Sequence, residues 1–109
     1  MNLTTNMKSI KLGVIGIDHG HIFDMLDEML KEGCTCNHFW TKDDPLTLKE
    51  FNSKYPNIKR KENKKEILND PSIDMILISS VPKDRANNSI EALKAGKDVM
   101  VDKPGCTTL

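Results

Sequence analysis

Residues 91–104 read Glu91-Ala-Leu-Lys-Ala-Gly-Lys-Asp-Val-Met-Val-Asp-Lys-Pro104, and no other part of the chain carries so clear a structural pattern. Its first half continues a helix whose apolar positions recur at helical spacing. These positions are Ala86, Ile90 and Leu93. Gly96 stands where a left-handed helix cap favours glycine. The pattern therefore predicts a helix over residues 84–95 that stops at Gly96.

The second half predicts a strand followed by a turn. Val99, Met100 and Val101 form a compact apolar run, which is typical of a parallel strand covered on both faces. Asp102 and Lys103 are then expected at the carboxyl end of that strand, where open α/β sheets bind their ligands. Lys103 is thus a candidate for chemistry, with an ordinary exposed turn lysine as the alternative.

Strand-like and helix-like segments alternate along the whole chain. The first strand is expected at residues 10–15, and the helix after it ends at Gly33. The second helix is expected to begin at Pro45 with Asp44 as its N-cap, and Asn63 with Glu66 resembles a capping box for a third. The remaining strands are expected at residues 34–40, 57–60, 75–78 and 98–101. This alternation favours βαβ units and an α/β fold with a parallel sheet of about five strands.

Length and composition set limits on the class of protein. The chain has 109 residues, which suits one domain, and its 16 Lys and Arg balance 16 Asp and Glu. No global charge favours nucleic acid or an anionic membrane, and no apolar run approaches the roughly 20 residues of a membrane-spanning helix. Residues 1–9 are expected to be a flexible leader without a signal-peptide core. Three cysteines without an obvious bridge favour a reduced, cytoplasmic protein. Cys34 and Cys36 could also form half of a metal site. This alternative is weaker, because the sequence has no second pair of ligands at a spacing typical of zinc sites.

The turn after the first strand, Gly13-Val-Ile-Gly-Ile-Asp-His-Gly-His-Ile22, is the second informative segment. In dinucleotide-binding units a glycine turn leads into a helix whose N-terminus holds pyrophosphate. Gly16 stands at the first glycine position, whereas Asp18 and His21 replace the other two. One interpretation is a modified cradle in which His19 or His21 binds phosphate or substrate. A second is a turn that Asp18 caps for itself, leaving no ligand site. A metal site from Asp18, His19 and His21 is the third.

With these segments together, the chain resembles the amino-terminal domain of the Gfo/Idh/MocA family (glucose–fructose oxidoreductase and inositol dehydrogenase). The resemblance covers residues 10–109 and rests on residues 10–16, 66–79 and 92–104. The family usually ends the last motif Glu-Lys-Pro, where this chain has Asp102-Lys103-Pro104. The resemblance implies a Rossmann-like doubly wound parallel sheet, with an NAD(P)-binding domain that is incomplete at residues 10–109. It also implies that the final helix and strand and a carboxyl-terminal substrate domain lie outside this chain.

The resemblance implies roles for particular residues. Gly16, Ile17, Asp18, His19 and His21 would face pyrophosphate, and Ser79, Ser80 and Val81 would run beside the nicotinamide ribose. Asp102 and Lys103 would also face the cofactor, and Lys103 would reach the reacting centre as the catalytic residue. At the end of the second strand, Thr41 and Lys42 favour NADP over NAD, although Asp43 could serve as the acid of an NAD site. No metal is expected.

The function implied is that of the cofactor-binding half of an NAD(P)-dependent oxidoreductase. Its substrate would be a hydroxyl or carbonyl group of a sugar, polyol or related small molecule. The chain alone is expected to be inactive, because the proton donor or acceptor comes from the second domain in this family. The open edge beside residues 99–101 would allow a homo-oligomer to form. The alternative is a non-catalytic nucleotide-binding or interaction module with a degenerate glycine turn.

Overall fold

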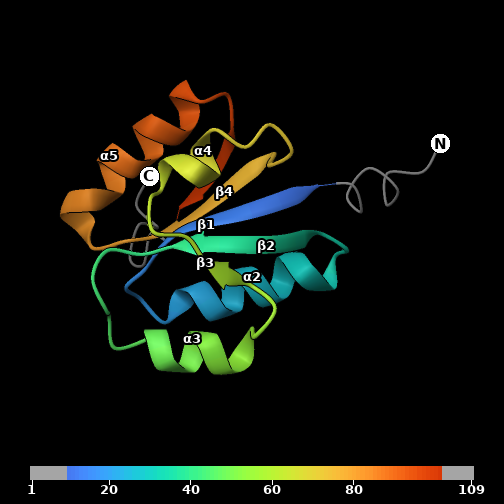
Figure 1. Cartoon of the computed structure of the whole chain (residues 1–109), viewed down its shortest axis with the longest axis vertical. Helices are drawn as coiled ribbons and strands as arrows, with labels where there is room; N and C mark the ends of the chain where they lie inside the picture. Colours follow the sequence, from blue (N-terminus) through green and yellow to red (C-terminus); the bar gives the residue numbers. More distant parts are fainter. Residues whose placement is uncertain (1–9, 102–109) are drawn as a thin grey trace, which may run out of the picture.

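In a computed structural model, residues 10–101 are described, and they form one parallel sheet with helices on both faces (Figure 1). The strands are β1 (Lys11–Ile17), β2 (Thr35–Trp40), β3 (Lys59–Arg60), β4 (Met75–Ser79) and β5 (Asp98–Val101). Their order in the sheet is β3-β2-β1-β4-β5, and every neighbouring pair is parallel. The helices are α2 (His21–Lys31), α3 (Leu48–Lys54), α4 (Lys65–Leu68) and α5 (Pro82–Lys94). The predicted Rossmann-like doubly wound sheet is confirmed.

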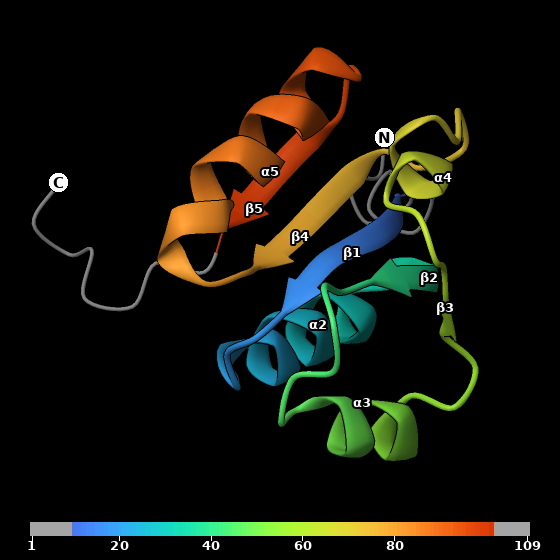
Figure 2. The same cartoon turned by 60° about the vertical axis from the view of Figure 1, so that its left-hand side comes forward.

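Two hydrophobic cores, one on each face, hold the helices to the sheet. Alternate residues of a strand point to opposite faces, so β1 sends Leu12 and Val14 to one core and Ile15 to the other. The first core includes residues of α2 and α3, and the second includes residues of α4 and α5. Figure 2 shows the two pairs of helices on opposite sides of the sheet. The central strands β1 and β4 are therefore almost wholly buried.

The second helix begins later than Asp44 and Pro45 predict. α3 starts at Leu48, after Thr47 at its N-cap. Asp44 instead accepts a hydrogen bond from Arg60 at 3.0 Å, and no side chain caps α3. The hydroxyl of Thr47 donates to the carbonyl oxygen of Ile17, which ties the start of α3 to the end of β1. The N-cap prediction is wrong because a contact with a distant strand outweighs the local capping pattern.

The start of α4 follows the predicted capping box only in part. The side-chain oxygen of Asn63 accepts the backbone N–H of Lys65 at 2.9 Å, as an Asx-type start requires. Glu66 forms an ion pair with Lys61 at 3.9 Å instead of completing the box.

The face of α5 that is buried is not the one its apolar residues suggest. Ile90 and Leu93 are 49% and 61% exposed, whereas Asn88 and Ala92 are buried. Strand β5 is likewise only half-buried, which corrects the expectation that both its faces are covered. It lies at the edge of the sheet formed by the described residues, so one of its sides has no neighbouring strand there. Gly96 has the predicted left-handed conformation, with φ of 82°.

Two further polar contacts stabilise the fold. Asp27 on α2 accepts a hydrogen bond from the hydroxyl of Tyr55 at 2.6 Å and pairs with Lys54 at 2.8 Å. The hydrogen bonds from Lys54 and then from Tyr55 hold the pKa of the Asp27 carboxyl below its usual value of 3.8. These contacts link α2 to α3.

On the other face, the ammonium group of Lys97 is buried at the approach to β5. It donates to the carbonyl oxygens of Ile73, at 2.7 Å, and of Asp70. Lys97 thus links the start of β5 to the segment that leads into β4. None of the helices within residues 10–101 has the length and hydropathy needed to cross a membrane.

Candidate nucleotide-binding site

The carboxyl ends of β1 and β4 meet at Gly16, where the pairing between the two strands shifts register between Ile15 and Ile17. Gly16 has a φ of 90°, a conformation that residues with a Cβ atom rarely adopt. A Cβ atom built there would lie 2.1 Å from the Oγ of Ser80. Gly16 is therefore required both for the backbone turn and for the close approach of Ser80. Strand order reverses here, since β2 lies on one side of β1 and β4 on the other.

The loop after β1 is bonded to the loop after β4. The backbone N–H of His19 donates to the carbonyl oxygen of Ser79 at 3.2 Å, and the hydroxyl of Ser79 donates back to the carbonyl oxygen of His19 at 3.2 Å. The carboxylate of Asp18 accepts the backbone N–H of Val81 at 3.0 Å. Gly20 is the N-cap of α2, and no side chain caps that helix. The interpretation in which Asp18 caps α2 is therefore wrong.

Three buried polar side-chain atoms have no hydrogen-bond partner among the described residues, and two of them belong to residues that follow strands at this edge of the sheet. These two are the Nε2 atom of His19 and the Oγ1 atom of Thr41. His19 follows β1 and Thr41 follows β2, and Thr41 is only 3% exposed. Buried polar atoms usually find a partner in the protein, in water or in a ligand. A polar ligand at this edge could supply the missing partners.

A cavity of about 250 Å³ lies between the loops that follow β1, β2 and β4. It is lined by the following residues: Asp18, Lys42, Asp43, Asp44, Pro45, Val81, Lys83 and Asp84. Four of these carry carboxylates and two carry ammonium groups, so the lining is mixed in charge with an acidic excess. The cavity joins residues that lie far apart in sequence at the switch point of the sheet.

Arg60 is a site residue that was not singled out in the sequence. Its guanidinium group binds Asp44 at 3.0 Å, the carbonyl oxygen of Thr41 at 3.2 Å and the carbonyl oxygen of Asp43. It lines a second cavity of about 500 Å³ together with Lys42 and Asp43. Arg60 is the last residue of β3, so the strand-end rule that selected Lys103 would also have selected Arg60.

The structure brings together most of the residues predicted for the cofactor. Gly16, Asp18, His19, Ser79, Ser80 and Val81 meet at the ends of β1 and β4, and Thr41 and Lys42 follow the neighbouring strand β2. Ile17 is different, because its side chain is fully buried in the core between the sheet and α2. His21 is exposed in the first turn of α2. Asp102 and Lys103 lie outside the described residues, so their predicted roles stay predictions.

Metal binding has no structural support in the described part of the chain. Within residues 10–101, no group of three or more His, Cys, Asp or Glu side chains is arranged to hold a metal ion. Cys34 and Cys36 are both buried and reduced. Burial raises the pKa of the Cys36 thiol to about 12, which opposes formation of the thiolate that a metal would bind.

Comparison with known families and structures gives a consistent result. The model of an oxidoreductase family with an NAD-binding Rossmann fold, Gfo/Idh/MocA, matches residues 10–109. Proteins of curated function show no significant match to the chain. A provisionally assigned oxidoreductase from Erwinia carotovora atroseptica is 32% identical, with a TM-score of 0.82, over 92% of this chain and 30% of that protein.

Other solved structures share the fold at lower identity. A provisionally assigned dehydrogenase from Thermotoga maritima is 27% identical, with a TM-score of 0.64, over 86% of this chain and 28% of that protein. Biliverdin reductase from Synechocystis, solved with biliverdin and NADP+, is 21% identical, with a TM-score of 0.71, over 88% of this chain and 28% of that protein. The chain thus spans less than a third of the length of these proteins. It belongs to the Gfo/Idh/MocA oxidoreductase family, through that family's NAD-binding Rossmann-fold domain.

Proposed function

We propose that this chain binds a nicotinamide dinucleotide at the carboxyl edge of β1 and β4, as the cofactor-binding half of an oxidoreductase. The observation that carries the proposal is the turn at Gly16. Its positive φ and the packing of Ser80 against it allow only glycine there, and a tight glycine turn of this kind is what leads the first strand into the pyrophosphate-binding helix of a dinucleotide site. The first turn of α2, which no side chain caps, lies next to it.

The residues around the turn fit the parts of the cofactor. The start of α2 and the loop of Asp18 and His19 would face the pyrophosphate, with His19 as a hydrogen-bonding side chain. The loop of Ser79, Ser80 and Val81 would run beside the nicotinamide ribose. When bound, the nicotinamide ring supplies or accepts a hydride. The chain's own residues would hold the dinucleotide in place through backbone N–H groups and hydroxyls.

Selection between the two cofactors would depend on the end of β2. We favour NADP, because Lys42 lines both cavities at this end and Arg60 lines the second of them. These two cations would neutralise the extra phosphate. The carboxylate of Asp43, which lines the same cavities, is the group that would favour NAD by binding ribose hydroxyls.

The proposed reaction is oxidation or reduction of a hydroxyl or carbonyl group on a sugar, a polyol or a related small molecule. Lys103 would act at the reacting centre as an ammonium donor to the carbonyl oxygen or the cofactor ribose. Acid–base chemistry on the substrate would need residues from a further domain. We also propose that the protein is cytoplasmic. We propose that it forms a homo-oligomer through the edge of the sheet at β5.

The alternative is a non-catalytic module that binds a nucleotide weakly or not at all. The acidic excess of the cavity at Asp18 favours this alternative, since carboxylates repel pyrophosphate. Calorimetric titration of the folded chain with NADPH and with NADH separates the two functions. Micromolar binding of either dinucleotide supports the cofactor-binding function. A folded chain that binds neither dinucleotide at millimolar concentration would support the alternative.

Cofactor preference needs a charge-reversal variant with a matched control. Lys42→Glu should weaken binding of NADPH about tenfold or more and change binding of NADH much less, because only NADPH carries the extra phosphate. Lys49→Glu makes the same charge change at an exposed position on α3 that lines neither cavity, and it should alter neither affinity. An equal loss for both dinucleotides in Lys42→Glu would contradict the NADP preference.

A further inference from the structure

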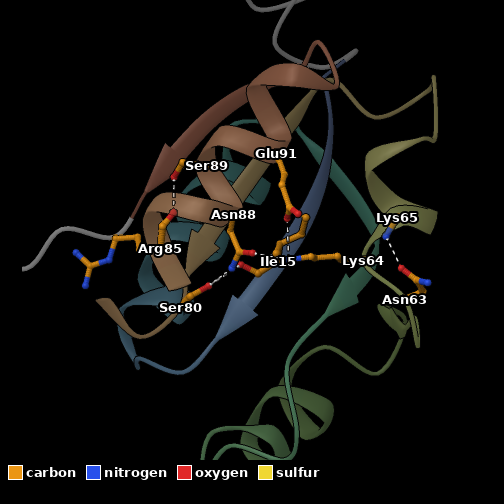
Figure 3. A network of polar contacts seen from close by, with 9 residues as sticks. All are labelled: Ile15, Asn63, Lys64, Lys65, Ser80, Arg85, Asn88, Ser89 and Glu91. Atoms are coloured by element: carbon orange, nitrogen blue, oxygen red, sulfur yellow. Dashed lines mark hydrogen bonds and ion pairs between the residues drawn. The ribbon is translucent and has the colours of Figure 1, made fainter. Parts of the chain in front are cut away.

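A chain of hydrogen bonds runs from Lys64, just before α4, to the glycine turn of β1 (Figure 3). The ammonium of Lys64 donates to the Oδ1 atom of Asn88 at 3.0 Å. The Nδ2 atom of Asn88 donates to the Oγ atom of Ser80 at 2.7 Å. The hydroxyl of Ser80 then donates to the carbonyl oxygen of Ile15 at 3.4 Å. Asn88 and Ser80 are only 3% and 2% exposed, so water competes little for these bonds.

In each of these hydrogen bonds the donor lies on the side of Lys64 and the acceptor on the side of Ile15, and Lys64 determines this order. An ammonium group can only donate, so it selects the amide orientation of Asn88 that places oxygen toward Lys64 and nitrogen toward Ser80. Because Ser80 then accepts from Asn88, its own proton is left to point at Ile15. Every donor in this series of hydrogen bonds therefore points away from Lys64 and toward the backbone next to Gly16. Bonds arranged head to tail in this way also strengthen one another.

Lys64 is itself held at a defined position. Its ammonium pairs with Glu91 at 2.7 Å and lies 5.3 Å from the ring centroid of Trp40. Glu91 is one helical turn from Asn88 on α5, and Trp40 is the last residue of β2. The start of this bond chain is thus fixed by two elements besides the segment that carries Lys64.

These hydrogen bonds end at Ile15, next to the turn at Gly16. Ser80 is the residue whose Oγ lies 2.1 Å from the place that a Cβ atom on Gly16 would occupy. We propose that Lys64 and Asn88 are positioning residues, which orient Ser80 and thereby hold the turn at Gly16 and the loop after β4 in the geometry that receives the dinucleotide. The cofactor part of this inference rests on the proposed function. The structural part concerns the two loops alone.

Asn88→Asp tests the direction of the bonds at nearly constant shape. Aspartate can only accept, so the proton of Ser80 must turn toward it and the carbonyl oxygen of Ile15 loses its donor. Lys64 keeps a partner at this position, since it gains an ion pair, and this favours a folded variant. Asn87→Asp is the matched control, because it adds the same charge at an exposed neighbouring position of α5.

The first measurement needs no cofactor. Hydrogen exchange of the backbone N–H groups of His19 and Val81 reports the bonds that join the two loops. Exchange at both should be about tenfold faster in Asn88→Asp than in Asn87→Asp, whereas exchange at Tyr55, on the opposite face of the sheet, should be equal in the two variants. Equal exchange at His19 and Val81 in the two variants would overturn the proposal.

The second measurement is the affinity for NADPH and NADH. In Asn88→Asp the dissociation constant of the dinucleotide that binds should rise about tenfold relative to Asn87→Asp. Lys64→Met should show the same loss, and Lys64→Arg, which keeps only donors, should restore most of it. Unchanged affinity in Asn88→Asp would overturn the positioning role. If the parent chain binds neither dinucleotide, the proposed function fails, and the exchange rates alone then decide whether these bonds hold the loops.

Discussion

Gly16→Ala is the substitution whose cost the structure defines best. At a φ of 90° an alanine is strained, which costs about 1–2 kcal/mol. Its methyl carbon would also lie 2.1 Å from the Oγ, 3.0 Å from the Cβ and 3.1 Å from the Cα of Ser80. Overpacking of this kind adds about 1–3 kcal/mol. We therefore expect Gly16→Ala to lower the free energy of unfolding by about 2–5 kcal/mol.

Urea unfolding followed by circular dichroism measures this loss, and Gly96→Ala is the control. Gly96 has a similar φ of 82°, but an added Cβ atom there meets nothing within 4 Å. Gly96→Ala should therefore show the strain alone, about 1–2 kcal/mol. The difference between the two variants isolates the contact with Ser80.

A double-mutant cycle with Ser80→Ala sharpens the test. Removing the hydroxyl deletes the 2.1 Å contact and leaves the Cβ atom of residue 80 at 3.0 Å, which a small backbone shift can relieve. Gly16→Ala should therefore cost at least about 1 kcal/mol less in the Ser80→Ala background than in the parent chain. Additive costs in the cycle, or equal costs for Gly16→Ala and Gly96→Ala, would refute the argument that Ser80 makes Gly16 obligatory.

Three other predictions follow from named contacts. Lys97→Met should lower the free energy of unfolding by about 1–3 kcal/mol, because the buried carbonyl oxygen of Ile73 and the partly buried one of Asp70 lose their donor, whereas Lys94→Met on the exposed side of α5 should change it little in the same urea experiment. The pKa of Asp27 is lowered in the folded chain by its lysine and tyrosine partners, so its carboxylate contributes stability above the usual carboxyl pKa and loses that contribution as pH falls through the folded pKa. The melting temperature of Asp27→Asn should thus be slightly below that of the parent at pH 7 and equal to it in strong acid; a constant gap across this pH range would contradict the assignment. Asp18→Asn keeps an oxygen that can accept from Val81 and removes one negative charge from an acidic cavity, so dinucleotide binding should tighten several-fold at low salt and less at high salt; weaker binding by calorimetry would show instead that the carboxylate contacts the cofactor.

Local sequence patterns predicted which segments become strands and helices, and where most of them stop. Gly96 needs no partner to favour a helix end, because a positive φ suits glycine anywhere in a chain. The compact apolar runs of β1 and β4 likewise indicate strands buried on both faces. The parallel sheet and its switch point follow from the alternation of these segments, so the position of Gly16 at the rim was predictable.

Packing between distant segments decided the remainder. The apolar spacing of α5 predicts a helix, yet Asn88 lies inward and Leu93 outward, because the amide of Asn88 finds one buried partner, Ser80, and one partly buried partner, Lys64. Those partners are far away in sequence: Lys64 is 24 residues from Asn88, and Ile15 is 65 residues from Ser80. Short-range periodicity carries no information about such pairs, since chain folding alone brings them within hydrogen-bonding distance. Most of the residues that follow β1, β2 and β4 at this edge of the sheet could therefore be named in advance, whereas the bonds that hold them in place became visible only in three dimensions.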